Sequence, residues 1–157
     1  MSPRRYRYYS KEPLFPFGFG LSYTAFSLAT DQAPLQLKTT DGPQTLRIHV
    51  AHAGGPAAAA VVQAYFEPGS DVTGVLAPKT QLFGFEKVWL DEGGAATASF
   101  DVSPAALALP AANGDLVAAP GDYALRFSLG DGGADVRVPL SLVGGAVVVE
   151  AFPARSS

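Results

Sequence analysis

The sequence contains no cysteine. Disulfide bonds, thiolate nucleophiles and cysteine-ligated metal sites are therefore excluded. The absence leaves the cellular compartment open, because a secreted domain with a large apolar core does not need disulfides.

Charge is also scarce. Charged residues make up 16% of the chain, with 11 basic and 14 acidic side chains and a net charge of −3, and the isoelectric point is about 5.2. This balance gives no basic surface for a nucleic acid or an anionic membrane, so we expect neither as a partner. No apolar run reaches the roughly 20 residues of a membrane helix, and no apolar signal-peptide segment follows the basic N-terminus.

Apolar residues and chain breakers are abundant instead. Hydrophobic residues make up 48% of 157 residues, which is enough for the core of one domain. Glycine (17) and proline (13) together account for 30 residues, so long helices have little room. The composition predicts one domain built from short elements.

Short strands follow one another at a spacing of about ten residues. Alternating or densely apolar segments, bounded by glycine, proline, aspartate and asparagine, lie at 44–52, 57–68, 81–90, 96–102, 122–129, 135–143 and 146–152. About seven such strands with turns between them predict an all-β fold, a two-sheet antiparallel sandwich of the immunoglobulin or fibronectin type III kind. Within 81–90, the interior Gly84 predicts a bulge or a close backbone approach. Ser103 and Pro104 predict one helical turn over 103–109.

The N-terminal region differs from the rest. Residues 1–12 are basic and rich in tyrosine, and residues 13–26, PLFPFGFGLSYTAF, are apolar. We interpret 1–26 as an extended interdomain arm, 27–143 as the sandwich domain, with 27–43 read as a linker that leads into it, and 144–157 as a C-terminal strand and tail. Six large side chains of the arm are expected to need a partner surface: Leu14, Phe15, Phe17, Phe19, Leu21 and Tyr23.

Several segments together resemble one known family. The elements are PLFPFGFGLSYTAF (13–26), VAHAG (50–54), VVQAY (61–65), KTQLFGFEKVWL (79–90), SPAALAL (103–109) and PGDY (120–123). In this order and spacing they resemble the C-terminal fibronectin type III-like domain of glycoside hydrolase family 3 and the segment that precedes it. RRYRYY (4–9) resembles the stretch before that segment in the β-xylosidase and α-arabinofuranosidase branch.

The resemblance implies a non-catalytic structural domain whose partners are the catalytic domains of a parent hydrolase. The parent would be an extracellular β-xylosidase-like or β-glucosidase-like enzyme that degrades xylan and other plant polysaccharides. The family's reaction resembles retaining hydrolysis with two carboxyl groups, and the segments that carry them precede the region matched here. No catalytic, cofactor-binding or metal-binding residue is therefore assigned, no cofactor is expected, and the chain alone is predicted to be inactive.

Several acidic residues and histidines of the chain are types that can carry chemistry of their own. Asp91 with Glu92, and Asp131 with Asp135, lie on turns and are interpreted as solvated loop charges. His49 and His52 are spaced to lie on opposite faces of a strand, so a shared metal site is not expected. We predict that His49 faces outward and that His52 satisfies backbone groups at a turn.

Aromatic residues allow two interpretations. Tyr65, Phe83, Phe85 and Trp89 could stack on a sugar, but a shared parity favours core packing for Phe83, Phe85 and Trp89. The arginines and tyrosines of residues 4–9 are interpreted as contacts to the catalytic body, in preference to nucleic-acid stacking. Two alternatives remain open: a free-standing module that binds carbohydrate, such as a polysaccharide, or protein, and an intact small hydrolase. The apolar arm argues against the first and the lack of a carboxylate pair against the second.

Overall fold

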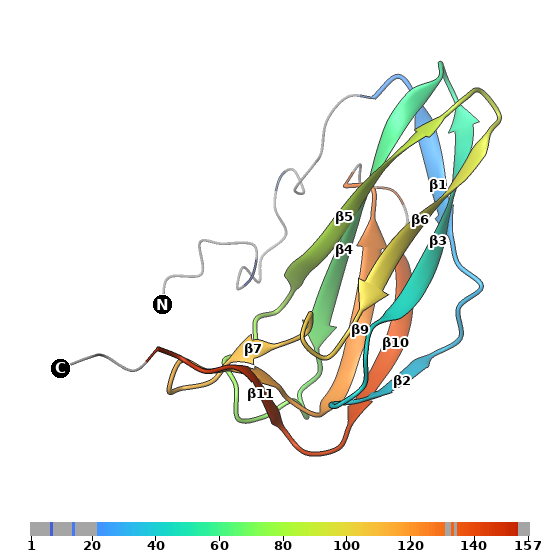
Figure 1. Cartoon of the computed structure of the whole chain (residues 1–157). Helices are drawn as coiled ribbons and strands as arrows, with labels where there is room; N and C mark the ends of the chain where they lie inside the picture. Colours follow the sequence, from blue (N-terminus) through green and yellow to red (C-terminus); the bar gives the residue numbers. More distant parts are fainter. Residues whose placement is uncertain (1–6, 8–13, 15–21, 131–132, 134, 154–157) are drawn as a thin grey trace.

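The computed structural model describes residues 7, 14, 22–130, 133 and 135–153, and these form a β-sandwich (Figure 1). No helix is present among them, so the predicted all-β class is confirmed. The strands are β1 (Ala25–Ala29), β2 (Leu35–Lys38), β3 (Gln44–Gly54), β4 (Ala58–Pro68), β5 (Gln81–Leu90), β6 (Ala95–Val102), β7 (Leu109–Pro110), β8 (Leu116–Ala118), β9 (Gly121–Ser128), β10 (Val136–Val143) and β11 (Val147–Glu150).

Two larger sheets make the sandwich. One has the strand order β1-β3-β6 and the other the order β2-β10-β9-β4-β5. β2 runs parallel to β10, whereas every other pair is antiparallel. A third, small sheet of β11, β8 and β7 lies at the lower end of the molecule in Figure 1. β5 and β6 are thus edge strands of the two facing sheets.

Alternation along the strands builds the core between the sheets. In β3 the side chains of Leu46, Ile48 and Val50 are fully buried, while the residues between them face outward. Phenylalanine rings fill the centre, with Phe100 and Phe127 5.3 Å apart between ring centroids. Each fully buried side chain of this size contributes roughly 1.5–3 kcal/mol to folding, so this core is enough to hold the sandwich together without disulfides.

The seven predicted strands are all present, but the linker predicted over 27–43 is wrong. β1 pairs with β3 and β2 pairs with the end of β10, so this region supplies two edge strands. Their four or five residues are too few for alternation to stand out from the turn residues around them. The predicted turn at 103–109 is present as hydrogen-bonded turns, with the Ser103 hydroxyl accepting the Ala106 N–H at 3.2 Å.

A β-bulge in β5 separates residues that share a sequence parity. The register between β4 and β5 shifts so that Ala64 pairs with Gly84 and the next residue, Tyr65, pairs with Leu82. The extra residue, Phe83, turns inward and its ring lies 6.3–6.5 Å from three buried phenylalanines. The bulge predicted from Gly84 is therefore confirmed.

Core packing of Phe85 and Trp89, in contrast, was a wrong prediction. Phe85 is 71% exposed and Trp89 is 64% exposed. Beyond the bulge, Gly84, Val88 and Leu90 hold the inward positions, and this places the odd-numbered residues on the outer face. Parity alone could not reveal this, because the bulge offsets the alternation before it from the alternation after it, so that Phe83 and Phe85 point to opposite sides.

Candidate functional site

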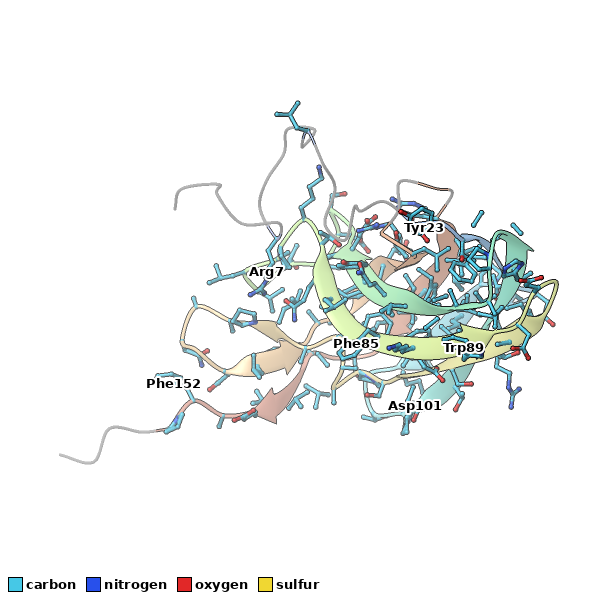
Figure 2. The ribbon with its side chains drawn as sticks, turned by 90° about the horizontal axis from the view of Figure 1, so that it is seen from above. Arg7, Tyr23, Phe85, Trp89, Asp101 and Phe152 are labelled. Atoms are coloured by element: carbon cyan, nitrogen blue, oxygen red, sulfur yellow. The ribbon has the colours of Figure 1, made fainter. Side chains whose placement is uncertain are left out.

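The outer face of β5 carries an exposed aromatic surface. Phe85, Lys87 and Trp89 project from it, and Val61 of β4, 39% exposed, lies opposite Lys87. Figure 2 shows Phe85 and Trp89 along the same strand. We call these four residues the β5 face. It joins two large rings on an edge strand with one aliphatic side chain on the neighbouring strand, a combination that is typical of an interaction surface.

Polar contacts orient one ring of the β5 face. The Trp89 indole N–H donates to Oδ1 of Asp91 at 3.3 Å, so the carboxylate that follows β5 holds the indole. Lys87 takes part in no ion pair within the described part of the chain. The face therefore combines apolar rings with one ammonium group that has no carboxylate partner there.

Arg7 of the N-terminal arm is hydrogen-bonded to residues just before and at the beginning of β5. The Arg7 carbonyl oxygen accepts the Lys79 N–H at 2.7 Å, and the Arg7 guanidinium donates to Oε1 of Gln81, the first residue of β5. These two contacts join residues more than 70 positions apart in the sequence.

A second attachment lies just before β1. The Thr24 hydroxyl donates to the Pro56 carbonyl at 2.7 Å, and the Thr24 N–H donates to the Ser22 hydroxyl at 3.1 Å. Thr24 is buried. A Cβ atom at Gly55, which has φ +95°, would lie 2.1 Å from the Tyr23 carbonyl oxygen. The close approach of the two backbones therefore requires glycine here.

An ion network lies on β4, β9 and β10. Arg126 Nε donates to Glu67 at 2.9 Å and Arg126 NH1 to Asp135 at 2.9 Å, while Arg137 reaches Glu67 at 2.6 Å. The Arg126 guanidinium also lies 4.5 Å from the centre of the Tyr65 ring. Burial disfavours the charged form of Arg126, but the hydrogen bonds and charges of Asp135 and Glu67 outweigh it and raise the pKa of the guanidinium. Because the charges in the network compensate one another, it stabilises the sheet more than it attracts a ligand.

The carboxylates weighed in the sequence lie in separate environments. Asp91 binds Trp89, Glu92 is exposed on the turn after β5, and Asp135 is paired with Arg126. Asp131 lies outside the described residues. Within the described residues, no three His, Cys, Asp or Glu side chains are grouped as metal ligands would be.

The two histidines behave as predicted. His49 is exposed on the outer face of β3, 3.8 Å from Asp31. His52 accepts the Gly93 N–H at Nδ1 (3.2 Å), and its Nε2 lies 3.3 Å from the Pro56 carbonyl. With Nδ1 accepting, the neutral ring carries its proton on Nε2 and donates it to Pro56. His52 thus satisfies backbone groups of two turns.

One contact that sequence reasoning missed closes the open edge between β5 and β6. The Glu86 carboxylate accepts the backbone N–H of Ser99, which belongs to β6. A charged residue at an inward position of an edge strand is the available sequence signal, because such residues often protect exposed strand edges.

In the described residues, no helix is long and apolar enough to cross a membrane.

Residues 60–128 match the family described as "Fibronectin type III-like domain". Over 95 residues, 56% of its length, the chain is 44% identical to "Probable beta-glucosidase I" of Aspergillus fumigatus. Over 110 residues, 67% of its length, it is 37% identical to "Periplasmic beta-glucosidase" of Salmonella typhimurium. It spans only 11% and 14% of these relatives.

Solved structures give the same result. A β-glucosidase of Listeria innocua superposes with a TM-score of 0.74 at 26% identity, over 92% of this chain and 20% of that chain. A GH3 β-glucosidase of Bifidobacterium adolescentis gives 0.65 at 31% identity, over 80% and 18%. A GH3 exo-β-xylosidase gives 0.81 at 20% identity, over 97% and 21%, which shows the shared fold alone. Residues 60–128 are thus a fibronectin type III-like domain, and the relatives and solved structures that the chain resembles are β-glucosidases and other GH3 enzymes.

Proposed function

We propose that this chain is the non-catalytic structural domain of a family 3 glycoside hydrolase and that it fixes the arrangement of the enzyme's catalytic domains. The observation that carries the proposal is the double attachment of the segment before β1, by Arg7 at one end and Thr24 at the other. A segment bound at two points transmits orientation, whereas a loose linker does not.

The relatives support a larger parent protein. Both of these relatives are several times longer than this chain, so the parent would carry its reacting carboxylates in other domains. The names of the curated relatives favour a β-glucosidase parent, and the RRYRYY segment favours a β-xylosidase of xylan breakdown. The word "Periplasmic" in one relative's name supports a parent that acts outside the cytoplasm.

A trans-complementation experiment tests the proposal. The Salmonella β-glucosidase is produced without the region that matches this chain, and its thermal midpoint and turnover of an aryl β-glucoside are measured with and without this chain. We expect the chain to raise the midpoint of the truncated enzyme and to hydrolyse no aryl β-glucoside, β-xyloside or α-arabinofuranoside by itself. Turnover by the chain alone that is abolished by Asp91→Asn or Glu92→Gln would refute the proposal.

Carbohydrate binding is the second candidate function. The exposed rings of Phe85 and Trp89 favour it, because aromatic faces can stack on the apolar faces of sugar rings. Retardation of the chain in native gels that contain xylan or laminarin, lost in Trp89→Ala, would support this candidate.

A further inference from the structure

We propose that the β5 face is the surface through which this domain packs on the catalytic region of its parent, with Phe85 and Trp89 as anchors and Lys87 paired to a carboxylate of that region. This inference rests on the proposed function and names the surface that carries it. The occupant is a protein surface, apolar around one acidic side chain.

The position of the two attachments supports this surface. Arg7 is bound to Gln81, the first residue of β5. Thr24 is bound to Pro56, two residues before Ala58, which pairs with Leu90, the last residue of β5. The segment that joins this domain to whatever precedes it is therefore held at both ends of β5, and Figure 2 shows Arg7 toward one end of the strand and Trp89 toward the other. A preceding domain on this segment lies on the β5 side.

Exposed side chains on the segment before β1 also support a partner surface on the β5 side. Leu14 is 96% exposed and Tyr23 is 94% exposed, although both are large and apolar or aromatic. Phe85 and Trp89 on β5 are 71% and 64% exposed. In total, four large apolar or aromatic side chains on β5 or on the segment before β1 are not packed in the core. Aromatic side chains of this kind supply most of the binding energy when a partner buries them.

The charge on the β5 face favours a protein over a sugar. Lys87 lies between Phe85 and Trp89 on the same side of the strand, so a sugar chain that crossed both rings would have to cover an ammonium group. A protein surface can offer that group a carboxylate and bury the rings around the pair. Val61 and Ala59, opposite Lys87 and Trp89 on β4, are small enough to let a partner surface reach both rings.

The single tryptophan of the chain makes the surface directly observable. We label Trp89 as 5-fluorotryptophan, which gives one ¹⁹F resonance, and add the unlabelled Salmonella β-glucosidase from which the region that matches this chain has been removed. We expect the solvent isotope shift of that resonance, measured between H₂O and D₂O, to disappear on binding as the indole becomes buried. Affinity is measured in parallel by calorimetry.

Three variants separate the possible results. Phe85→Ser is expected to weaken binding at least about tenfold, as truncation of a buried interface aromatic does, and Lys87→Glu is expected to weaken it as well. Val148→Ser, which alters an exposed apolar residue on the third sheet, is the control and should bind like the wild type. Because all three side chains are exposed, denaturant midpoints should confirm that each variant folds.

The experiment distinguishes refutation of the proposed surface from refutation of the proposed structural function. Binding that leaves the Trp89 isotope shift unchanged, or that Phe85→Ser does not weaken, would overturn the proposed surface and leave the structural function standing. Absence of binding by the wild-type chain would refute both. Loss of the isotope shift on addition of xylo- or laminari-oligosaccharides, without binding to the truncated enzyme, would assign the β5 face to carbohydrate instead.

Discussion

The Tyr123 hydroxyl donates a hydrogen bond of 2.7 Å to the carbonyl oxygen of Ala119, four residues earlier, and both residues are buried. This contact ties the beginning of β9 to the chain that leads into it, in the manner of the tyrosine corner of immunoglobulin-like sandwiches. Beside Tyr123, the Asp122 N–H donates to Oδ2 of Asp71, in the loop after β4, at 2.9 Å.

Replacement of Tyr123 by Phe should destabilise the sandwich by about 1–3 kcal/mol, because it leaves the buried Ala119 carbonyl without its donor. Urea denaturation at pH 7 measures the effect. Phe152→Tyr, which adds a hydroxyl to an exposed ring, serves as a control for aromatic exchange. A Tyr123→Phe variant with the wild-type midpoint would show that the corner does not contribute.

Tyr123 also predicts a loss of stability at high pH. Burial, reinforced by the charge of Asp71, raises the pKa of Tyr123 to about 12 from 10.0. Because the pKa is raised in the folded state, the contribution of the neutral hydroxyl is fully present below pH 10 and is lost as the pH rises from 10 to 12. The difference in unfolding free energy between the wild type and Tyr123→Phe should therefore shrink over that range. A difference that is constant from pH 8 to pH 12 would contradict this assignment.

Gly84 should tolerate one added methyl group but not a branched side chain. A Cβ atom at this position would lie 3.4 Å from Cδ1 of Phe100, which is ordinary contact, whereas the γ-methyl groups of valine would meet the Phe100 ring. We expect Gly84→Val to cost about 1–3 kcal/mol through overpacking and Gly84→Ala to cost much less. Denaturant midpoints of the two variants test this, and equal midpoints would show that the space beside Phe100 is not limiting.

Glu86 should protect the edge of β6. Removal of its carboxylate in Glu86→Ala deprives the Ser99 N–H of its acceptor, at a cost of about 0.5–1.5 kcal/mol. Hydrogen exchange followed by NMR should show faster exchange of the Ser99 amide, while Glu86→Gln, which keeps a carbonyl acceptor, should largely restore protection. Glu92→Ala on the nearby turn is the control, and unchanged Ser99 exchange in Glu86→Ala would refute the role.

Alternation of apolar and polar residues predicted most of the fold, because a strand with one buried face buries every second side chain. Leu46, Ile48 and Val50 in β3 and Tyr123, Leu125 and Phe127 in β9 follow this rule, and all six are buried. β1 and β2 escaped prediction because edge strands of four or five residues bury few side chains, so the turn residues on either side of them dominate this region of the sequence.

The candidate surface was predictable only in part. The sequence identified Phe83, Phe85 and Trp89 as one set, and the bulge at Gly84 was expected, but the consequence of the bulge for each ring depends on which strand lies opposite. Pairing of Ala64 with Gly84 and of Tyr65 with Leu82 decides that Phe83 is buried and that Phe85 is not. Contacts such as Arg7 with Gln81 and Glu86 with Ser99 join distant positions, and no local pattern encodes them.

The sandwich should fold without residues 1–21 of the N-terminal arm, but it should need Thr24. Phe15, Phe17, Phe19 and Leu21 lie outside the described residues, but Leu14 and Tyr23 are almost fully exposed, and exposed apolar side chains drive self-association. Deletion of residues 1–21 removes Leu14 and leaves Tyr23. It should therefore make the protein more monomeric and lower its stability by no more than about 2 kcal/mol, the net worth of the two Arg7 hydrogen bonds. Deletion of residues 1–24 also removes the buried Thr24 and its hydrogen bond to Pro56, and should destabilise the protein further. Light scattering and urea denaturation of the two truncated proteins test the difference. If the full chain is monomeric and deletion of residues 1–21 already unfolds it, the arm is an integral part of this domain.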